Sequence, residues 1–109
     1  MRDWLRQLRK EDRETLRLIA AAIDILGEQG PALGRPLVDT IQGSELRNLK
    51  ELRPGSSGSS EVRILFAFDP SRRAVLLVAG DKSGNWRGWY EQAIPLAEER
   101  YSAHLESQE

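Results

Sequence analysis

Residues 62–81 read VRILFAFDPSRRAVLLVAGD, and the two apolar runs within them predict a β-hairpin. In the first run, from Val62 to Phe68, large apolar residues stand at every second position, the period of a strand with one face on a core. The second run, residues 74–79, is apolar throughout, as in a strand that is covered on both faces. The turn-forming residues Asp69, Pro70, Ser71 and Arg72 separate the two runs.

The segments just before this hairpin are shorter and less regular. Residues 49–53 (LKELR) predict one more short strand. Residues 54–60 (PGSSGSS) resemble a flexible linker, but between two short strands they are better interpreted as a hairpin loop. Residues 31–45 contain two glycines and two prolines that interrupt any period, so we expect an irregular connection there.

Helices are predicted at both ends of the chain. A short amphipathic segment places Trp4, Leu5 and Leu8 on one side, and a longer one carries Leu16, Ile19, Ile23 and Leu26 at helical spacing. Gly27, Gly30 and Pro31 are expected to end this second helix. From Gly84 onward the pattern is helical again, and Pro95 is expected to kink that segment or to begin another helix.

The order of these elements predicts the fold class α+β. We expect residues 1–109 to form a single domain, with a small antiparallel sheet, two N-terminal helices and a C-terminal helix. Two layers would place the helices on one face of the sheet. A hydrophobic content of 39% with 30% charged residues is that of an ordinary soluble globular protein.

Composition excludes several classes of site. The chain has no cysteine and one histidine, His104, so neither disulfides nor a structural zinc site is expected. The net charge of −1 argues against a protein that coats nucleic acid, although it allows a local basic site. No apolar run is long enough to span a bilayer and no secretory signal precedes the first helix, so we expect a cytoplasmic protein without membrane contacts.

Four short stretches resemble a known family when they are taken together and in order. They are residues 30–36 (GPALGRP), 49–54 (LKELRP), 62–68 (VRILFAF) and 80–82 (GDK). In this arrangement the chain resembles the phage-derived HigB-like branch of the RelE/ParE toxin superfamily, from about Gly30 to about Tyr101. The resemblance implies a RelE-like sheet with flanking helices, cleavage of messenger RNA, in many members on the ribosome, and a helix-turn-helix antitoxin of the HigA type as partner.

The resemblance departs at the N-terminus. Members of the family usually begin with a strand ahead of the first helix, whereas here Met1 leads almost directly into Trp4 and Leu5. Either a preceding segment is missing or the sheet lacks an edge strand, which would leave neighbouring backbone groups open to a partner.

RNA cleavage without a metal requires the 2′-OH to attack the adjacent phosphate while charge on the phosphate is neutralised and protons are moved. Two histidines are not available, so a site of Arg, Lys and Tyr remains, which the resemblance also implies. Arg63 is the foremost candidate: it lies opposite the apolar face of its strand, on a face expected to be exposed or to line a cleft. Arg53 repeats this logic one strand earlier, and the structural alternative is a surface pair with Glu51.

Other candidates follow the hairpin. Lys82 lies in the loop after the apolar strand, where family members carry an aromatic and lysines, and Asp81 replaces the aromatic and could pair with it. Tyr90 could donate a proton or stack on a base, or serve as a core residue with its hydroxyl at the rim. Lys50 points away from Arg53 in this register and is a weaker candidate for RNA binding.

Three more side chains near the start of the last helix are candidates for RNA binding: Arg87, Trp86 and Trp89. The two tryptophans are three residues apart, so one can belong to the core while the other offers a stacking surface. His104, close to the C-terminus, is expected to be solvated and is a low-ranked alternative.

The sequence therefore predicts a cofactor-free and metal-free messenger RNA endoribonuclease, a toxin that inhibits translation. In this reading Arg63 and Arg53 bind phosphate, while Lys82 and Tyr90 assist. Two other functions remain open: the same fold acting on DNA gyrase, and a phage-derived module that only binds a partner.

Overall fold

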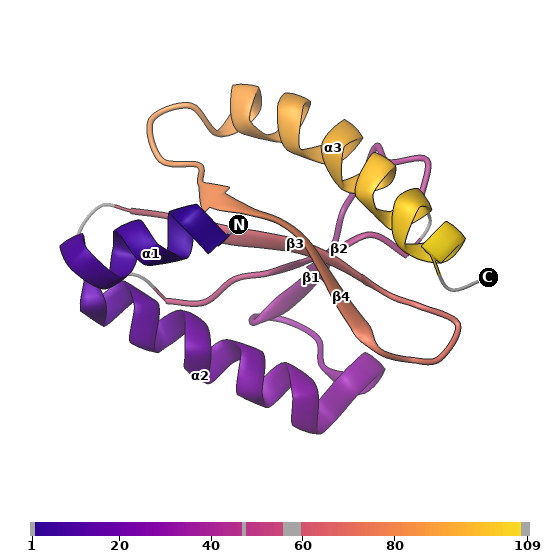
Figure 1. Ribbon diagram of the computed structural model, residues 1–109, viewed down its shortest axis with the longest axis horizontal. Helices are drawn as coiled ribbons and strands as arrows, with labels where there is room; N and C mark the ends of the chain where they lie inside the picture. The colour runs from indigo at the N-terminus through magenta and orange to yellow at the C-terminus, as the bar shows by residue number, and fades with distance from the viewer. Residues whose placement is uncertain (1, 47, 56–59, 108–109) are drawn as a thin grey trace.

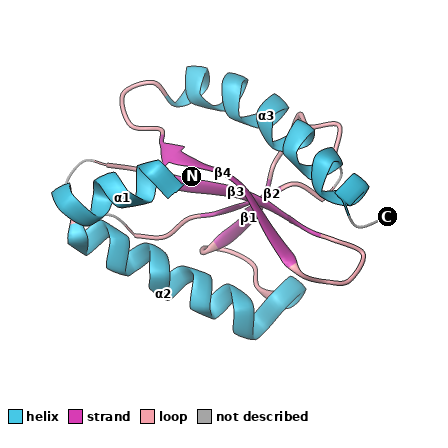
Figure 2. Cartoon of the chain, in the orientation of Figure 1, coloured by secondary structure: helices cyan, strands magenta, loops and turns pink. Residues whose placement is uncertain are grey.

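The computed structural model describes residues 2–46, 48–55 and 60–107, without the side chains of residues 2 and 3. Four strands form one antiparallel sheet in the order β1-β2-β3-β4. Their bounds are Val38–Thr40, Lys50–Leu52, Val62–Phe68 and Ala74–Asp81. The helices are α1 (Arg2–Glu11), α2 (Arg13–Gln29), the 3-10 turn η1 (Gly30–Ala32) and α3 (Trp86–Ser107). The predicted α+β class, with two helices before the sheet and one after it, is confirmed (Figure 2).

The helices lie on both faces of the sheet, which corrects the predicted two-layer arrangement. Helices α1 and α2 cover one face and α3 crosses the other (Figure 1). On the first face, Ile19 and Leu26 of α2 pack against Val62, Ile64 and Phe66 of β3. The second core contains buried residues of the sheet and of α3, namely Leu49, Leu65, Ala67, Leu77, Val78, Ala93 and Ala97. Both faces have an apolar core because Leu65 and Ala67 of β3 point to the side opposite Val62, Ile64 and Phe66.

The hairpin of β3 and β4 forms as predicted, with an irregularity in its register. Leu65 pairs with Val78 but Phe66 pairs with Leu76, so Leu77 is an additional residue on β4. This bulge lets Leu77 and Val78 both enter the core beneath α3. The turn closes with a hydrogen bond from the amide of Arg72 to the carbonyl oxygen of Asp69.

Helix α2 begins and ends at the residues that the sequence marks. Asp12 is its N-cap and accepts a hydrogen bond from the amide of Thr15 at 3.1 Å. Gly30 follows its last turn with φ +58°, a conformation that favours glycine, as expected for a residue that ends a helix.

The structure differs from two expectations about local structure. Val38–Thr40, inside the segment expected to be irregular, forms edge strand β1, because its residues pair with Lys50, Glu51 and Leu52 of β2. No second helix begins at Pro95, because buried Ala93 and Ala97 fix the turns on either side of it against the sheet and α3 continues while the exposed proline faces solvent. Strand β2 pairs with β3, as the predicted hairpin requires, but residues 56–59 of its loop lie outside the described residues. Within the described part no strand precedes α1.

Candidate active site

Arg53 and Arg63 lie side by side on the face of the sheet that α3 covers. Leu52 pairs with Ile64, and both belong to the core beneath α2. Side chains alternate along a strand. Arg53, which follows Leu52, and Arg63, which precedes Ile64, therefore face the opposite side of the sheet, towards α3. The amide of Arg53 donates to the carbonyl oxygen of Leu37, which holds its backbone at the sheet edge.

The two arginines converge on the carboxylate of Glu51, whose side chain is only 3% exposed. The Nε atom of Arg53 lies 2.8 Å from Oε1 of Glu51, and the Nε atom of Arg63 lies 3.7 Å from the same oxygen. The second oxygen, Oε2, accepts a hydrogen bond from the hydroxyl of Tyr90 on α3 at 2.5 Å. Burying a carboxylate costs free energy unless the carboxylate is paired. Here Arg53, Arg63 and Tyr90 are the groups that pair with it.

Some donors of this cluster remain unused. Arg63 donates through Nη1 to the carbonyl oxygen of Val62, and its buried Nε has no hydrogen-bond partner. Arg53 uses Nε for Glu51 and Nη2 for Asp39. Among the described residues, Nη2 of Arg63 and Nη1 of Arg53 therefore have no hydrogen-bond partner. An anion with several oxygens would find these donors already oriented.

Ionisation at the site is set by these contacts. Burial, and next the hydrogen bond to Glu51, raise the pKa of the Tyr90 hydroxyl above its ordinary value, so it stays protonated and able to donate. The hydrogen bond to Glu51 raises the pKa of the Arg53 guanidinium. At the outer end of the cluster, the hydrogen bond from Arg35 lowers the pKa of Asp39.

Lys82 joins the cluster through Tyr90. Its ammonium lies 5.4 Å from the centre of the Tyr90 ring, a cation–π contact. Asp81, which could have paired with Lys82, instead accepts hydrogen bonds from the backbone amides of Glu61 and Ser83, each at 2.9 Å. Partial burial opposes ionisation of Asp81, but these donors outweigh it and lower its pKa. The loop therefore leaves the charge of Lys82 facing the tyrosine.

Of the two tryptophans, Trp89 belongs to the core and Trp86 lies at the surface, as their spacing of three residues allowed. Trp89 packs into the core directly over Gly80, where even a Cβ atom would lie 2.5 Å from its Nε1. Trp86 is 55% exposed and its ring lies 5.4 Å from the guanidinium carbon of Arg87. Both rings meet the Tyr90 ring edge to face. Trp86 and Arg87 are thus the surface members of this group.

A groove runs past Glu51, Arg53, Tyr90 and Trp86, whereas Arg63 and Lys82 lie beside it and do not line it. One hollow of about 360 Å³ is lined by Asp39, Thr40, Ile41, Gln42, Glu51, Arg53, Trp86, Tyr90 and Ile94. It shares Trp86 and Tyr90 with a second hollow of about 470 Å³, which extends past Arg87 to Glu98. Glu98 holds the loop that forms the far wall, because it accepts hydrogen bonds from the hydroxyl of Ser44 at 2.7 Å and the amide of Glu45 at 2.6 Å.

Several predicted site residues need correction. Arg63 was expected on a face that is exposed or lines a cleft; its side chain is only 17% exposed, because α3 covers that face, so the first of these alternatives is wrong. Lys50 pairs across the sheet with Phe66, a residue of the core beneath α2, so it points away from Arg53 as predicted, and this position removes it from the candidates for RNA binding. His104 is not solvated: its Nε2 lies 3.1 Å from Oδ2 of buried Asp69 at the far end of the sheet.

Glu51 is the residue that the sequence interpretation passed over. The alternation in residues 50–53 places Glu51 and Arg53 on one face, which is correct, but the pair was weighed as a surface contact. Burial of that face depends on where α3 lies, and no local pattern around Glu51 reveals that position.

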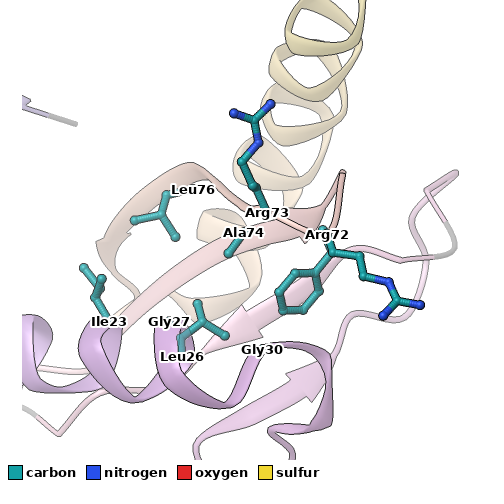
Figure 3. Close-up of a pocket in the computed structure, with 9 residues that line it drawn as sticks. Ile23, Leu26, Gly27, Gly30, Arg72, Arg73, Ala74 and Leu76 are labelled. Atoms are coloured by element: carbon teal, nitrogen blue, oxygen red, sulfur yellow. The ribbon is translucent and has the colours of Figure 1, made fainter. Parts of the chain in front are cut away.

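Another hollow, of about 380 Å³, lies between α2 and the β3–β4 hairpin. Figure 3 shows Ile23 and Leu26 facing the strand that carries Leu76, while the side chain of Arg73 extends towards α3. There Arg73 lies 3.5 Å from Asp69. The hollow itself is mostly apolar and brings together no acid and base.

The described part of the chain, residues 2–46, 48–55 and 60–107, offers neither a metal site nor a membrane-spanning helix. No three His, Cys, Asp or Glu side chains in this part gather closely enough to bind a metal ion. None of its helices combines the length and apolar character that crossing a membrane requires.

The chain matches a known protein family over most of its length. A family model for phage-derived Gp49-like proteins (DUF891) matches residues 3–102. The chain belongs to this family, in agreement with the predicted resemblance to phage-derived toxins.

Two relatives come from Mycobacterium tuberculosis. The protein named "Putative toxin HigB2" is 59% identical over 102 residues, 94% of this chain and 49% of that relative. "Putative toxin HigB3" is 50% identical over 97 residues, 89% of this chain and 82% of that relative. The chain thus spans about half the length of the first relative and most of the second. No solved structure matches the chain.

Proposed function

We propose that this chain is the toxin of a toxin–antitoxin system and that it is a metal-independent endoribonuclease acting on messenger RNA. The names of the two relatives support the first part. The observation that carries the second part is the cluster around Glu51, where two guanidinium groups share one carboxylate and keep donors without a partner. Planar guanidinium groups suit the oxygens of a phosphodiester.

Substrate binding begins with the groove. A phosphate of the RNA accepts hydrogen bonds from the unused nitrogens of Arg53 and Arg63, and the flanking base stacks on the exposed ring of Trp86. Arg87 stands beside that ring and adds a further contact to the backbone. Lys50, on the other face of the sheet, takes no part.

Cleavage then needs two proton transfers. The 2′-oxygen attacks the adjacent phosphorus, and the carboxylate of Glu51, displaced from its arginines by the phosphate, accepts the proton. The bond to the 5′-oxygen breaks, and that oxygen takes a proton from Tyr90 or Lys82, which lie in cation–π contact with each other. The products are a 2′,3′-cyclic phosphate and a 5′-hydroxyl. Both arginines stabilise the charge that builds on the phosphate.

The setting follows from the family. The proposal includes a helix-turn-helix antitoxin that binds the toxin and keeps it inactive, a messenger that is cut on the ribosome, and a cytoplasmic location; the resemblance to HigB-like toxins supports these parts of it. The near-neutral net charge fits an enzyme that depends on a local site more than on general attraction to RNA.

The test compares growth arrest and messenger cleavage by the wild type and by Arg63→Ala. Losing one preorganised donor to the phosphate is expected to slow cleavage by roughly 10²–10³-fold and to relieve the growth arrest. Arg72→Ala is the matched control, because Arg72 is exposed on the distant hairpin turn and outside the groove. A folded Arg63→Ala protein that still arrests growth and cuts messenger like the wild type would refute the proposal.

A further inference from the structure

A second basic surface lies on α1 and the beginning of α2. A hollow of about 380 Å³ there is lined by four cationic residues and no others: Arg6, Arg9, Lys10 and Arg13. An adjoining hollow of about 440 Å³ shares Arg9 and Arg13 and adds Arg17 with two small apolar contacts. We call Arg6, Arg9, Lys10 and Arg13 the basic hollow. It belongs to the helices that cover the sheet face opposite α3, away from the candidate active site (Figure 1).

The basic hollow keeps its positive charge among the residues whose side chains the structure describes, which do not include residue 3. Within the described part of the chain, none of its four cations forms an ion pair. The nearby carboxylates are engaged elsewhere: Asp12 caps α2 through Thr15, and Glu11 accepts a hydrogen bond from Gln7. Four like charges in one concave place create a local positive potential in a chain whose net charge is −1.

The chemistry of the lining selects the kind of partner. All four side chains are exposed and end in a charged group, so the apolar surface inside the basic hollow comes from their flexible aliphatic stems and includes no buried apolar side chain that could anchor a protein partner. Protein interfaces draw their binding energy from such buried anchors and are depleted in lysine. The apolar hollow beside β4 has that character, with Ile23, Leu26 and Leu76 in its lining (Figure 3). A phosphate backbone needs only several cations placed close together.

We propose that the basic hollow is a docking surface for the phosphate backbone of folded RNA, separate from the groove that cleaves. The inference rests on the proposed function for the identity of the polyanion. The protein then contacts RNA on two opposite faces, with the cleavage groove under α3 and the docking surface on α1 and α2. Docking affects how RNA is held and leaves the chemical step unchanged.

The experiment uses the full chain, with Arg9→Gln/Arg13→Gln as the variant and Arg72→Gln as the control. Arg72 is also an exposed arginine, but it lies on the far hairpin. The first probe is a 12-base-pair RNA duplex with 2′-O-methyl groups, which cannot be cut, titrated by fluorescence anisotropy over a range of KCl concentrations. The second probe is a trinucleotide substrate too short to span both faces, and the third is poly-glutamate of equal total charge.

We expect the double variant to bind the duplex roughly ten-fold more weakly, with a salt slope reduced by about 1.5–2. The same variant should bind the trinucleotide as tightly as the wild type does, and Arg72→Gln should change neither result. Unchanged duplex binding by the double variant would overturn the inference. So would loss of poly-glutamate binding with RNA binding intact, since that result indicates an acidic protein partner. If the wild type cuts no RNA but its duplex binding depends on Arg9 and Arg13, the nuclease proposal fails and the docking surface stands.

Discussion

The molecule carries two groups of arginines, and their surroundings differ in almost every respect. Arg53 and Arg63 lie beneath α3, partly buried, and share the carboxylate of Glu51. Arg9 and Arg13 lie on the outside of the helical layer, exposed and without ion pairs in the described residues. In the first pair the guanidinium groups are held in place and their charge is largely neutralised by carboxylates. In the second pair no ion pair among the described residues neutralises the charge, and the exposed side chains are held less firmly.

This difference separates two ways in which a protein handles phosphate. A guanidinium group that must point at a phosphate in one direction has to be held by other groups. A buried carboxylate holds it, but it also neutralises the positive charge of the guanidinium group. Attraction over a distance requires the opposite, cations that no neighbour compensates. A small chain with a net charge of −1 gains both properties only by placing them on different faces.

Glu51→Gln breaks the comparison most severely, because it removes the carboxylate that Arg53 and Arg63 share and leaves only the contact of Arg53 with Asp39. The substitution keeps the shape of the side chain but places an amide where a buried carboxylate faced two guanidinium groups. We expect the free energy of unfolding to fall by about 3–5 kcal/mol, the usual effect of removing one partner of a buried ion pair. Urea denaturation measures this change.

Glu99→Gln serves as the control for the loss of charge. Glu99 is exposed on α3, and its substitution should change the free energy of unfolding by less than about 0.5 kcal/mol. Equal stability of Glu51→Gln and Glu99→Gln would mean that the carboxylate of Glu51 does not hold the arginines in solution.

How much of this could be predicted from the sequence depends on whether a feature is local. The hairpin of residues 62–81 and the cap at Gly30 follow from alternation and turn chemistry, which act over a few residues. Arg53 and Arg63 could be placed on one face because a strand alternates strictly, and the structure has them side by side.

The failures concern packing between distant segments. The position of α3 decides that Glu51 is buried, that Arg63 is mostly covered and that His104 meets Asp69. Strand β1 was missed because its three residues follow Pro36 and precede Gly43, a context typical of loops, and only pairing with β2 makes it a strand. Neither outcome is encoded in a short window of sequence.

A pH titration of Tyr90 tests the groove side of the comparison between the two groups of arginines. Its expected effect is smaller than that of Glu51→Gln. The pKa of Tyr90 is raised in the folded protein by burial and by Glu51, while the unfolded chain titrates near about 10. The stabilisation from the neutral hydroxyl is therefore fully present below about pH 10 and is lost as the pH rises through the folded value. The measurement is tyrosinate absorbance near 295 nm, taken as wild type minus Tyr90→Phe.

We expect this difference signal to appear only above pH 10 for the folded protein, and near pH 10 in concentrated urea. The urea sample controls for changes in the spectrum that do not come from ionisation. A folded midpoint at or below 10 would show that Glu51 does not hold the Tyr90 hydroxyl in solution, which would contradict the arrangement of the cluster.

The smallest expected effect is on the free energy of unfolding when the exposed arginines of the basic hollow, Arg9 and Arg13, are replaced. Arg9→Gln/Arg13→Gln removes two exposed cations that touch no carboxylate in the described structure, so nothing buried loses a partner. We expect the free energy of unfolding to change by less than about 0.5 kcal/mol, against several for Glu51→Gln. Urea denaturation of both variants under one buffer makes the contrast direct. A loss above 1 kcal/mol in the double variant would show that these arginines stabilise the α1–α2 layer, and any loss of RNA binding would then need a structural explanation.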